Sequence, residues 1–201
     1  MIAIIDYDAG NMLSVVKALD YLGCEPVVTR DPDTLQKADK VILPGVGAFG
    51  DAMDKLNGYD LVPVIKNIIS QDKPFLGICL GLQLLYEYSE EAPNVKGIGA
   101  LAGGIKKIPV GQYSKIPQMG WNSLEYPNPG RLFKGIDEGA YVYFVHSYYL
   151  EAADRSTVVA TTSYNVTIDA SVESRNVFAC QFHPEKSGAV GLRILENFIG
   201  L

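Results

Sequence analysis

The chain has 201 residues, of which 48% are hydrophobic and 20% are charged, and its net charge is -6 at pH 7. These fractions are typical of soluble globular domains and exclude disordered, collagen-like and disulfide-scaffold classes. The acidic balance and the lack of a basic cluster argue against nucleic acid as a partner.

The chain contains three cysteines and two histidines. No pair of cysteines has the spacing of a zinc ligand set, so we expect no metal, and no phosphate-binding G-x-x-x-x-G-K-[ST] motif is present, so we expect no nucleotide or other cofactor. Unpaired thiols suit a reducing cytoplasm. The first residues lack a basic segment, so we predict no signal peptide, and no apolar run reaches the length of a membrane helix.

The first half alternates short apolar runs with helical patterns. Strands are predicted at Ile2–Asp6, Val27–Thr29, Val41–Leu43 and Phe75–Ile78. Helices are predicted at Asn11–Leu22 with Gly23 after it, at Phe49–Leu56 and Leu61–Ser70 separated by Gly58, and at Leu80–Ser89. Alternation of continuous apolar strands with helices is typical of a parallel sheet covered on both faces.

The second half consists mainly of strand-like segments separated by turn residues. They are Ile105–Ile108, Asn122–Tyr126, Ala140–Val145, Ser147–Leu150, Val158–Ser163, Val166–Glu173 and Asn176–Phe182, followed by a helix at Ser187–Ile199. No linker separates the halves. We therefore predict one α/β domain over residues 1–201, in which a mostly parallel central sheet is covered by helices and carries an additional antiparallel strand region.

A cysteine lies at the turn between a predicted strand and a predicted helix. The segment Gly77-Ile78-Cys79-Leu80-Gly81 has the G-x-S-x-G pattern of a nucleophile elbow, with cysteine in place of serine. Such a turn strains the backbone of the nucleophile, and the glycines allow neighbouring backbone to approach. The helix N-terminus favours the thiolate, and the amide of Leu80 would contact the reacting oxygen. Cys24 and Cys180 lack flanking glycines and are predicted to be packing residues.

A thiolate nucleophile needs a histidine partner. His183 follows a predicted strand, and Pro184 favours an extended backbone at His183 that would project the imidazole from the strand end. Glu185 can hold the imidazole in one tautomer, as the third member of a triad does. His146 has no neighbouring carboxylate and is predicted to bind or to support structure rather than to act as the base.

A second glycine-containing loop follows another predicted strand. Pro44-Gly45-Val46-Gly47 comes after Val41–Leu43, and such a loop can present backbone amides to an oxyanion. The same pattern also describes an ordinary turn. We predict that the amide of Val46 or of Gly47 is the second oxyanion donor, and the residues leave both alternatives open.

Together these motifs resemble the class I, triad-type glutamine amidotransferases, and within them the glutaminase subunits of imidazole glycerol phosphate synthases. The segments that carry the resemblance span nearly the whole chain and are Pro44–Gly50, Gly77–Gln83, Pro117–Asn122, Tyr143–Tyr148 and Gln181–Ser187. The resemblance implies a triad of Cys79, His183 and Glu185, and an oxyanion hole of Leu80 with Val46 or Gly47. Bound L-glutamine is implied to contact Gln83, His146, Ser147 and Tyr148.

The resemblance also implies a partner. Members of this family pass ammonia through a tunnel to a (β/α)8-barrel cyclase in a heterodimer, and they often need the liganded cyclase to complete the oxyanion hole. Tyr143, Lys186, Trp121 and Asn122 would lie at or near the ammonia exit and the cyclase contact. The reaction implied is hydrolysis of glutamine to glutamate and ammonia in histidine biosynthesis.

Three alternatives remain open from the sequence. The same glutaminase chemistry could supply another synthase, for example one that makes anthranilate, pyridoxal phosphate or GMP. The elbow could belong to a thiol peptidase or esterase, or the chain could be a binding module without catalysis. A covalent adduct of a glutamine analogue on Cys79 would distinguish the enzymes from the binding module.

Overall fold

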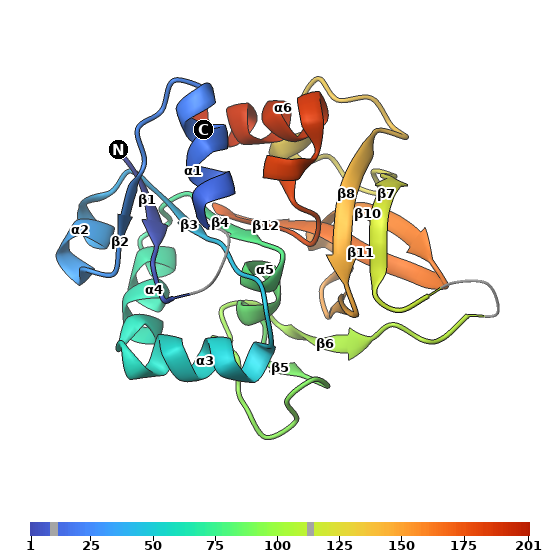
Figure 1. Ribbon diagram of the computed structural model, residues 1–201, viewed down its shortest axis with the longest axis horizontal. Coiled ribbons are helices and arrows are strands. Elements are labelled where there is room, and N and C mark those ends of the chain that lie inside the picture. The colour runs from blue at the N-terminus through green and yellow to red at the C-terminus, as the bar shows by residue number, and fades with distance from the viewer. Residues whose placement is uncertain (9–11, 112–114) are drawn as a thin grey trace.

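The computed structural model describes residues 1–8, 12–111 and 115–201. Its largest sheet contains seven strands: β1 (Ile2–Ile5), β2 (Val27–Thr29), β3 (Lys40–Leu43), β4 (Phe75–Ile78), β10 (Val158–Tyr164), β11 (Val166–Ser174) and β12 (Val177–Cys180). Their order is β10-β11-β12-β4-β3-β1-β2 (Figure 1). The strands from β12 to β2 are parallel, whereas β11 pairs antiparallel with both β10 and β12. The predicted fold class is therefore confirmed.

Helices cover both faces of this sheet. They are α1 (Met12–Tyr21), α2 (Pro32–Lys37), α3 (Phe49–Gly58), α4 (Leu61–Ser70), α5 (Leu80–Leu84) and α6 (Gly188–Ile199). In Figure 1, α1 and α6 lie on one side of the sheet and α3, α4 and α5 on the other. Alternate strand residues supply the two cores: Ile4 packs with the α1 and α6 residues, and Ile5 packs with those of α3 to α5.

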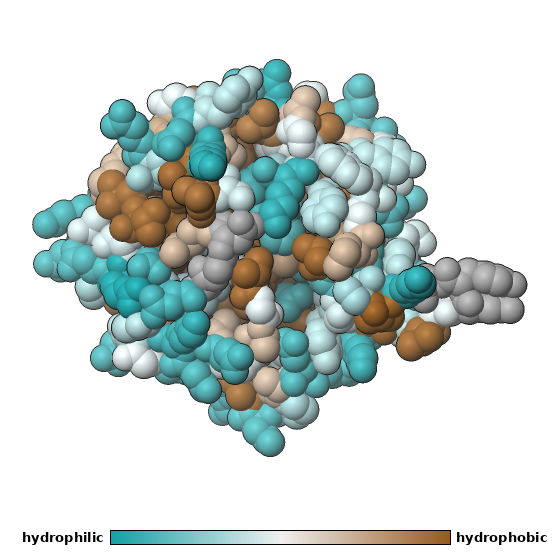
Figure 2. Space-filling model, viewed as in Figure 1, coloured by the Kyte–Doolittle hydropathy of each residue, from teal (hydrophilic) through white to brown (hydrophobic). Residues whose placement is uncertain are grey.

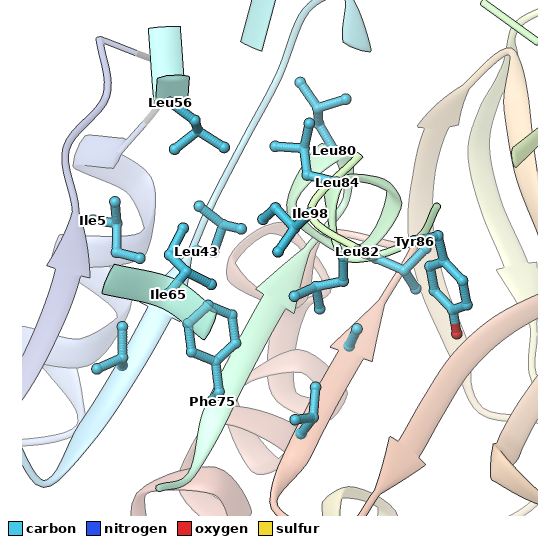
Figure 3. Packing of buried hydrophobic residues seen from close by; sticks show 14 of the residues in the cluster. Ile5, Leu43, Leu56, Ile65, Phe75, Leu80, Leu82, Leu84, Tyr86 and Ile98 are labelled. Carbon is cyan, nitrogen blue, oxygen red and sulfur yellow. The ribbon is translucent and has the colours of Figure 1, made fainter. Parts of the chain in front are cut away.

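The core under α3, α4 and α5 fixes where the helix after β4 begins. Figure 3 shows Leu43 of β3, Phe75 of β4 and the α5 residues Leu80 and Leu82 converging with Ile65 of α4. All five side chains are at most 3% exposed. Burial of each such side chain stabilises the fold by roughly 1.5–3 kcal/mol. The turn between β4 and α5 is thus anchored on both sides by buried leucine and phenylalanine.

The described residues also form two smaller sheets and three 3-10 turns. The small sheets consist of β5 (Tyr88–Ser89), β6 (Gly103–Lys107) and β9 (Tyr148–Ala152), and of β7 (Gln118–Ser123) and β8 (Tyr141–His146). The 3-10 turns are η1 (Arg131–Phe133), η2 (Arg155–Thr157) and η3 (Pro184–Lys186). β7 and β8 pair antiparallel, with Trp121 opposite Tyr143. Strands of the second half therefore extend the central sheet and also form a separate ribbon.

One predicted helix is shorter than its sequence pattern indicated. The prediction of a helix over Leu80–Ser89 is wrong beyond Leu84, where α5 ends after five residues. The carbonyls of Leu84 and Leu85 accept hydrogen bonds from Ile98 and Ala100, at 2.8 and 2.9 Å, instead of from a following helical turn. This pairing with a distant segment ends the helix, and residues 88–89 join a strand instead.

One predicted strand is displaced, and one helix was not predicted. The predicted strand Asn122–Tyr126 is displaced, because pairing with β8 places β7 at Gln118–Ser123. α2 was not predicted, although Asp31 caps its N-terminus by accepting from the amide of Thr34 at 2.8 Å and Pro32 follows. Asn11, the predicted start of the first helix, lies outside the described residues.

Hydrophilic residues cover most of the face shown in Figure 2, and hydrophobic residues also reach the surface at the side where Figure 1 places β6 and β7. Four large hydrophobic side chains of the segment from residue 110 to 141 are exposed: Val110, Met119, Trp121 and Tyr141. Within the described ranges, no helix has the length and apolar character needed to cross a membrane.

Candidate active site

Cys79 occupies a strained backbone position between β4 and α5. Its φ is 55° and its ψ is -106°, a conformation that costs a non-glycine residue of order 1–3 kcal/mol. The flanking glycines are required by close packing. A Cβ added at Gly81 would lie 1.9 Å from the carbonyl oxygen of Leu43, and one at Gly77 would lie 2.8 Å from that of Gly81. The local geometry is that of a nucleophile elbow.

His183 follows the strand next to the elbow, three residues after the end of β12. β12 pairs parallel with β4, with Cys180 opposite Ile78, so the chain leaves both strands at the same edge of the sheet. Nδ1 of His183 lies 2.7 Å from Oε1 of Glu185, and both side chains are 2% exposed. Among the described residues, Nε2 of His183 has no hydrogen-bond partner. Glu185 therefore orients the imidazole and leaves Nε2 available.

The two histidines have opposite pKa shifts. Burial disfavours the charged form of His183, but the interactions with Cys79 and Glu185 outweigh burial and raise its pKa to about 9. Because Nε2 of His183 makes no hydrogen bond to any described residue, we attribute the effect of Cys79 on the pKa of His183 to charge. Burial lowers the pKa of His146 to about 4. At neutral pH His183 can therefore carry and donate a proton, whereas His146 remains neutral.

The raised pKa of His183 predicts a pH-dependent stability. An unfolded histidine titrates near 6.5, so the stabilisation is complete below that pH and is lost as pH rises through about 9. We expect the wild type to lose up to about 3 kcal/mol more unfolding free energy between pH 6 and pH 10 than His183→Gln. Urea unfolding at both values measures this. His146→Gln should retain the wild-type loss, and identical losses in the wild type and His183→Gln would contradict the raised pKa.

The elbow and the imidazole line one cavity of about 400 Å³. The cavity is bordered by the residues predicted as nucleophile, imidazole, oxyanion loop and substrate contacts. Glu185, the predicted third member of the triad, does not border it and lies behind His183. The cavity lining comprises Val46, Gly47, Cys79, Leu80, Gln83, Glu91, Pro117, Val145, His146, Ser147, Tyr148 and His183. The volume suits a ligand of amino-acid size. A thiol beside a proton-carrying imidazole in such a cavity can perform acyl transfer through a thioester.

The predicted oxyanion residues lie at the cavity, and one of their amides is engaged. The Leu80 amide donates to the carbonyl oxygen of Gly45, at 3.3 Å. Gly47 has a φ of +106°, which favours glycine. The phenol of Tyr7 donates to the carbonyl oxygen of Pro44 at 2.8 Å and holds the start of this loop. As placed here, the Leu80 amide cannot also donate to a ligand in the cavity without a shift of the Gly45 carbonyl.

A buried hydrogen-bonded chain connects the predicted substrate-binding residues. Nδ1 of His146 donates to the carbonyl oxygen of Tyr148 at 2.8 Å, because a carbonyl can only accept. Nε2 of Gln83 donates to the same carbonyl at 3.1 Å. Nε2 of His146 lies 3.0 Å from the side-chain oxygen Oε1 of Gln118. These contacts fix the side of Gln83 and His146 that faces the cavity.

Four predicted residues lie outside the cavity, beside η3 and the β7–β8 ribbon. Trp121 is 54% exposed and packs edge-to-face on Tyr143, with ring centroids 6.1 Å apart. The carbonyl of Tyr143 accepts from the amide of His183 at 3.0 Å. Lys186 is exposed, and Asn122 donates to the carbonyl of Ser163 at 3.0 Å. This group, hereafter the ribbon face, is joined to the cavity through the backbone of His183.

Three cavity residues and one neighbour of the thiol were not predicted from the sequence. Glu91 lines the cavity, and its Oε2 accepts from the first amide of α3, that of Phe49, at 2.8 Å. Glu91 was not predicted because it follows the predicted helix, which ended at Ser89, in a segment for which no element or motif was predicted. Pro117 and Val145 belong to segments that carry the family resemblance, but no role was predicted for them. Gln181, two residues before His183, donates to Sγ of Cys79 at 3.7 Å.

No group of three or more histidine, cysteine, aspartate or glutamate side chains could hold a metal ion in the part of the chain that the structure describes. The three cysteines are free thiols. Cys180 is fully buried in the sheet, and burial raises the pKa of its thiol.

Comparison with known proteins agrees with this geometry. The family model "Glutamine amidotransferase class-I" matches residues 3–200. The chain is 50% identical over 197 residues to the imidazole glycerol phosphate synthase subunit HisH of Moorella thermoacetica, covering 98% of this chain and 93% of that protein. It is 48% identical over 205 residues to the same subunit of Geobacillus kaustophilus, covering 100% and 97%.

Solved structures share the fold at lower identity. One, described as a glutamine amidotransferase, superposes with a TM-score of 0.77 at 18% sequence identity, covering 98% of this chain and 97% of that one. The structure of PurLQS from Thermotoga maritima superposes with a TM-score of 0.74 at 23% identity, covering 99% and 97%. These two superpositions establish the architecture.

Proposed function

Because the chain belongs to the class-I glutamine amidotransferase family, we propose that it is the glutaminase subunit of an imidazole glycerol phosphate synthase in histidine biosynthesis. It hydrolyses glutamine to glutamate and ammonia, and residues 1–201 act as one amidotransferase domain. The observation that carries the proposal is the placement of Cys79 and the His183–Glu185 pair at one cavity. Identity of about 50% along the whole chain favours this subunit over amidotransferases of other synthases.

Hydrolysis begins at the thiolate of Cys79, which attacks the side-chain amide carbon of glutamine. Nε2 of His183 protonates the departing nitrogen, so ammonia leaves and a γ-glutamyl thioester remains. Water then gives a proton to His183 and attacks the thioester, which releases glutamate and restores the thiol. Glu185 keeps Nδ1 of His183 protonated and oriented throughout. The raised pKa of His183 supports its role as the acid of the first step.

Substrate binding is assigned to one wall of the cavity, formed around Gln83. Both hydrogens of the Gln83 amide are used, toward Tyr148 and Gln181, so its carbonyl oxygen remains as an acceptor for the substrate. His146, Ser147 and Tyr148 complete this wall. The carboxylate of Glu91 would attract the α-ammonium group of glutamine. Glutamine is thus held by both ends, with its amide next to Cys79.

The oxyanion of the tetrahedral intermediate is assigned to two backbone amides. The Leu80 amide is one donor, and the amide of Val46 or Gly47 is the other. The bond from Leu80 to the Gly45 carbonyl must open before this hole can form. This requirement supports low activity in the isolated subunit and activation by the liganded partner.

A cyclase partner is part of the proposal. Free ammonia must reach its acceptor before it is protonated, so a (β/α)8-barrel cyclase would bind the ribbon face in a heterodimer and receive ammonia beside Tyr143 and Lys186. Trp121 and Asn122 would contribute to the interface, since an exposed tryptophan is a common anchor of such contacts. The cyclase would use this ammonia, together with its own substrate, to make imidazole glycerol phosphate and aminoimidazole carboxamide ribotide. We place this complex in the cytoplasm.

The test is co-purification of this chain with the cyclase, followed by a glutaminase assay with and without the substrate of the cyclase. We expect glutamate release by the complex and an increase when the cyclase substrate is bound. A glutamine-analogue electrophile should label Cys79 in the same complex. Cleavage of peptides or esters without any release of glutamate would contradict the proposal and favour a thiol hydrolase.

A further inference from the structure

Gln181 is a buried amide that lies against the proposed nucleophile. Its side chain follows β12, is 0% exposed, and has its Nε2 3.7 Å from Sγ of Cys79. Its backbone amide is bonded to the carbonyl of Ala170 at 2.8 Å, which fixes the residue to β11. The carbonyl of the preceding Cys180 accepts from the amide of Cys79 at 2.8 Å. Gln181 and the nucleophile are therefore held rigidly together by main-chain bonds.

The orientation of the Gln181 amide is dictated by a group that cannot donate. The carbonyl oxygen of Tyr148 only accepts, so the partner that Gln83 turns toward it must be the amide nitrogen. That same nitrogen lies 3.0 Å from the Gln181 side chain and can only donate, so Gln181 must present Oε1 to it. The Nε2 of Gln181 is then turned toward Cys79. The hydrogen bonds from Gln83 to Tyr148 and to Gln181 therefore determine which atom of Gln181 contacts the sulfur.

The sulfur needs such a donor because the helix that follows is short. A helix N-terminus favours an anion through the aligned dipoles of its turns, and α5 has only five residues. Cys79 is 7% exposed, so water supplies little solvation to a thiolate. An N–H aimed at the sulfur stabilises the anion more than the neutral thiol.

We propose that Gln181 is a further catalytic residue of this site: it donates a hydrogen bond to Sγ of Cys79, favours the thiolate over the thiol, and is held in that orientation by Gln83. The proton released by Sγ goes to Nε2 of His183. The inference rests on the proposed glutaminase function for its use of the thiolate. Because Gln83 also contacts the proposed substrate cavity, one amide serves both the substrate and the nucleophile.

The experiment measures the rate at which iodoacetamide alkylates Cys79 in the full chain as a function of pH, with mass spectrometry of the peptides to separate the three cysteines. In Gln181→Met, which keeps the side-chain length and removes the donor, we expect roughly tenfold slower alkylation of Cys79 at pH 7 and a profile displaced by about one pH unit to higher pH. Gln181→Glu should shift the profile further, because a buried carboxylate repels the thiolate.

The matched control is Gln118→Met, which removes another buried glutamine amide that contacts His146 instead of sulfur. Its Cys79 profile should stay within about twofold of the wild type. Cys180, which is 0% exposed, reports folding in the same experiment, since alkylation of Cys180 marks a disrupted sheet. If Cys180 is alkylated in Gln181→Met, the experiment uses Gln83→Met instead. This variant frees the Gln181 amide to rotate, so it should shift the pH profile of Cys79 alkylation in the same direction.

An unchanged Cys79 profile in a variant that keeps Cys180 protected would overturn the proposal. In the activated complex, Gln181→Met should lower kcat for glutamine with little change in KM, because Gln181 contacts the sulfur and not the substrate. Alkylation needs neither glutamine nor the cyclase. A wild type that is alkylated as expected but releases no glutamate would therefore refute the proposed function and leave the role of Gln181 at the sulfur standing.

Discussion

Replacement of Cys79 by alanine is expected to reduce glutamine-dependent glutamate release by about 10⁴-fold or more, while cyclisation driven by added ammonium salt continues in the complex. The size of the effect follows from the loss of the only nucleophilic sulfur that lines the cavity within the described ranges. The second half of the prediction follows because free ammonia bypasses the thioester. Glutamate release and product formation are measured in parallel, with either nitrogen source.

The control for this variant is Cys24→Ala. Cys24 is a half-buried free thiol outside the cavity, so its removal should leave both activities within about twofold of the wild type. Loss of the ammonia-driven reaction in Cys79→Ala would argue against a separate glutaminase step. Retention of glutamine-driven turnover would exclude Cys79 as the nucleophile.

Substitution of Gly81 by alanine is expected to have the largest effect on stability. The added Cβ would lie 1.9 Å from the carbonyl oxygen and 2.9 Å from the carbonyl carbon of Leu43, and both are backbone atoms that cannot rotate away. Either β3 or α5 must move, although both are anchored in the core. We expect a loss of more than about 3 kcal/mol of unfolding free energy, or no soluble protein. Urea unfolding monitored by circular dichroism measures it.

Gly58→Ala provides the comparison. Gly58 is the last residue of α3, and a Cβ added there meets no atom within 4 Å. Alanine is the better helix former by about 1 kcal/mol, so this variant should be as stable as the wild type or more stable. Equal unfolding midpoints for the Gly81 and Gly58 variants would mean that the close approach of α5 to β3 is not required.

The parts of the site that sequence predicts best are those with a backbone requirement. Gly77 and Gly81 leave no room for a side chain, and Pro184 restricts the residue before it, so the positions of Cys79 and His183 could be predicted from the chain alone. The strands that precede Cys79 and His183 were also predicted, because buried strands have continuous apolar runs. The register of β4 and β12 shows that these two strands are neighbours in the sheet.

The parts that sequence predicted poorly depend on partners distant in the chain. The end of α5 is set by hydrogen bonds from the amides of residues 98 and 100, so helical periodicity alone predicted a helix that is too long. The contact of Glu91 with α3 is also between distant residues and was not predicted. Gln181 has an ordinary strand-end position, and only its bonds to Gln83 and Cys79 distinguish it. α2 is different, since Asp31 and Pro32 gave a local capping signal that could have been used.

The insertion of β12 between β4 and β11 has a consequence for the order in which the protein is made. Cys79 and Gln181 are 102 residues apart in the chain, so a ribosome completes the elbow long before it delivers the histidine strand. During that interval, one side of the apolar strand β4 has no neighbour and is open to incorrect pairing. A nascent chain that has not yet reached His183 lacks the proposed proton donor, so it cannot complete the proposed glutaminase reaction at Cys79.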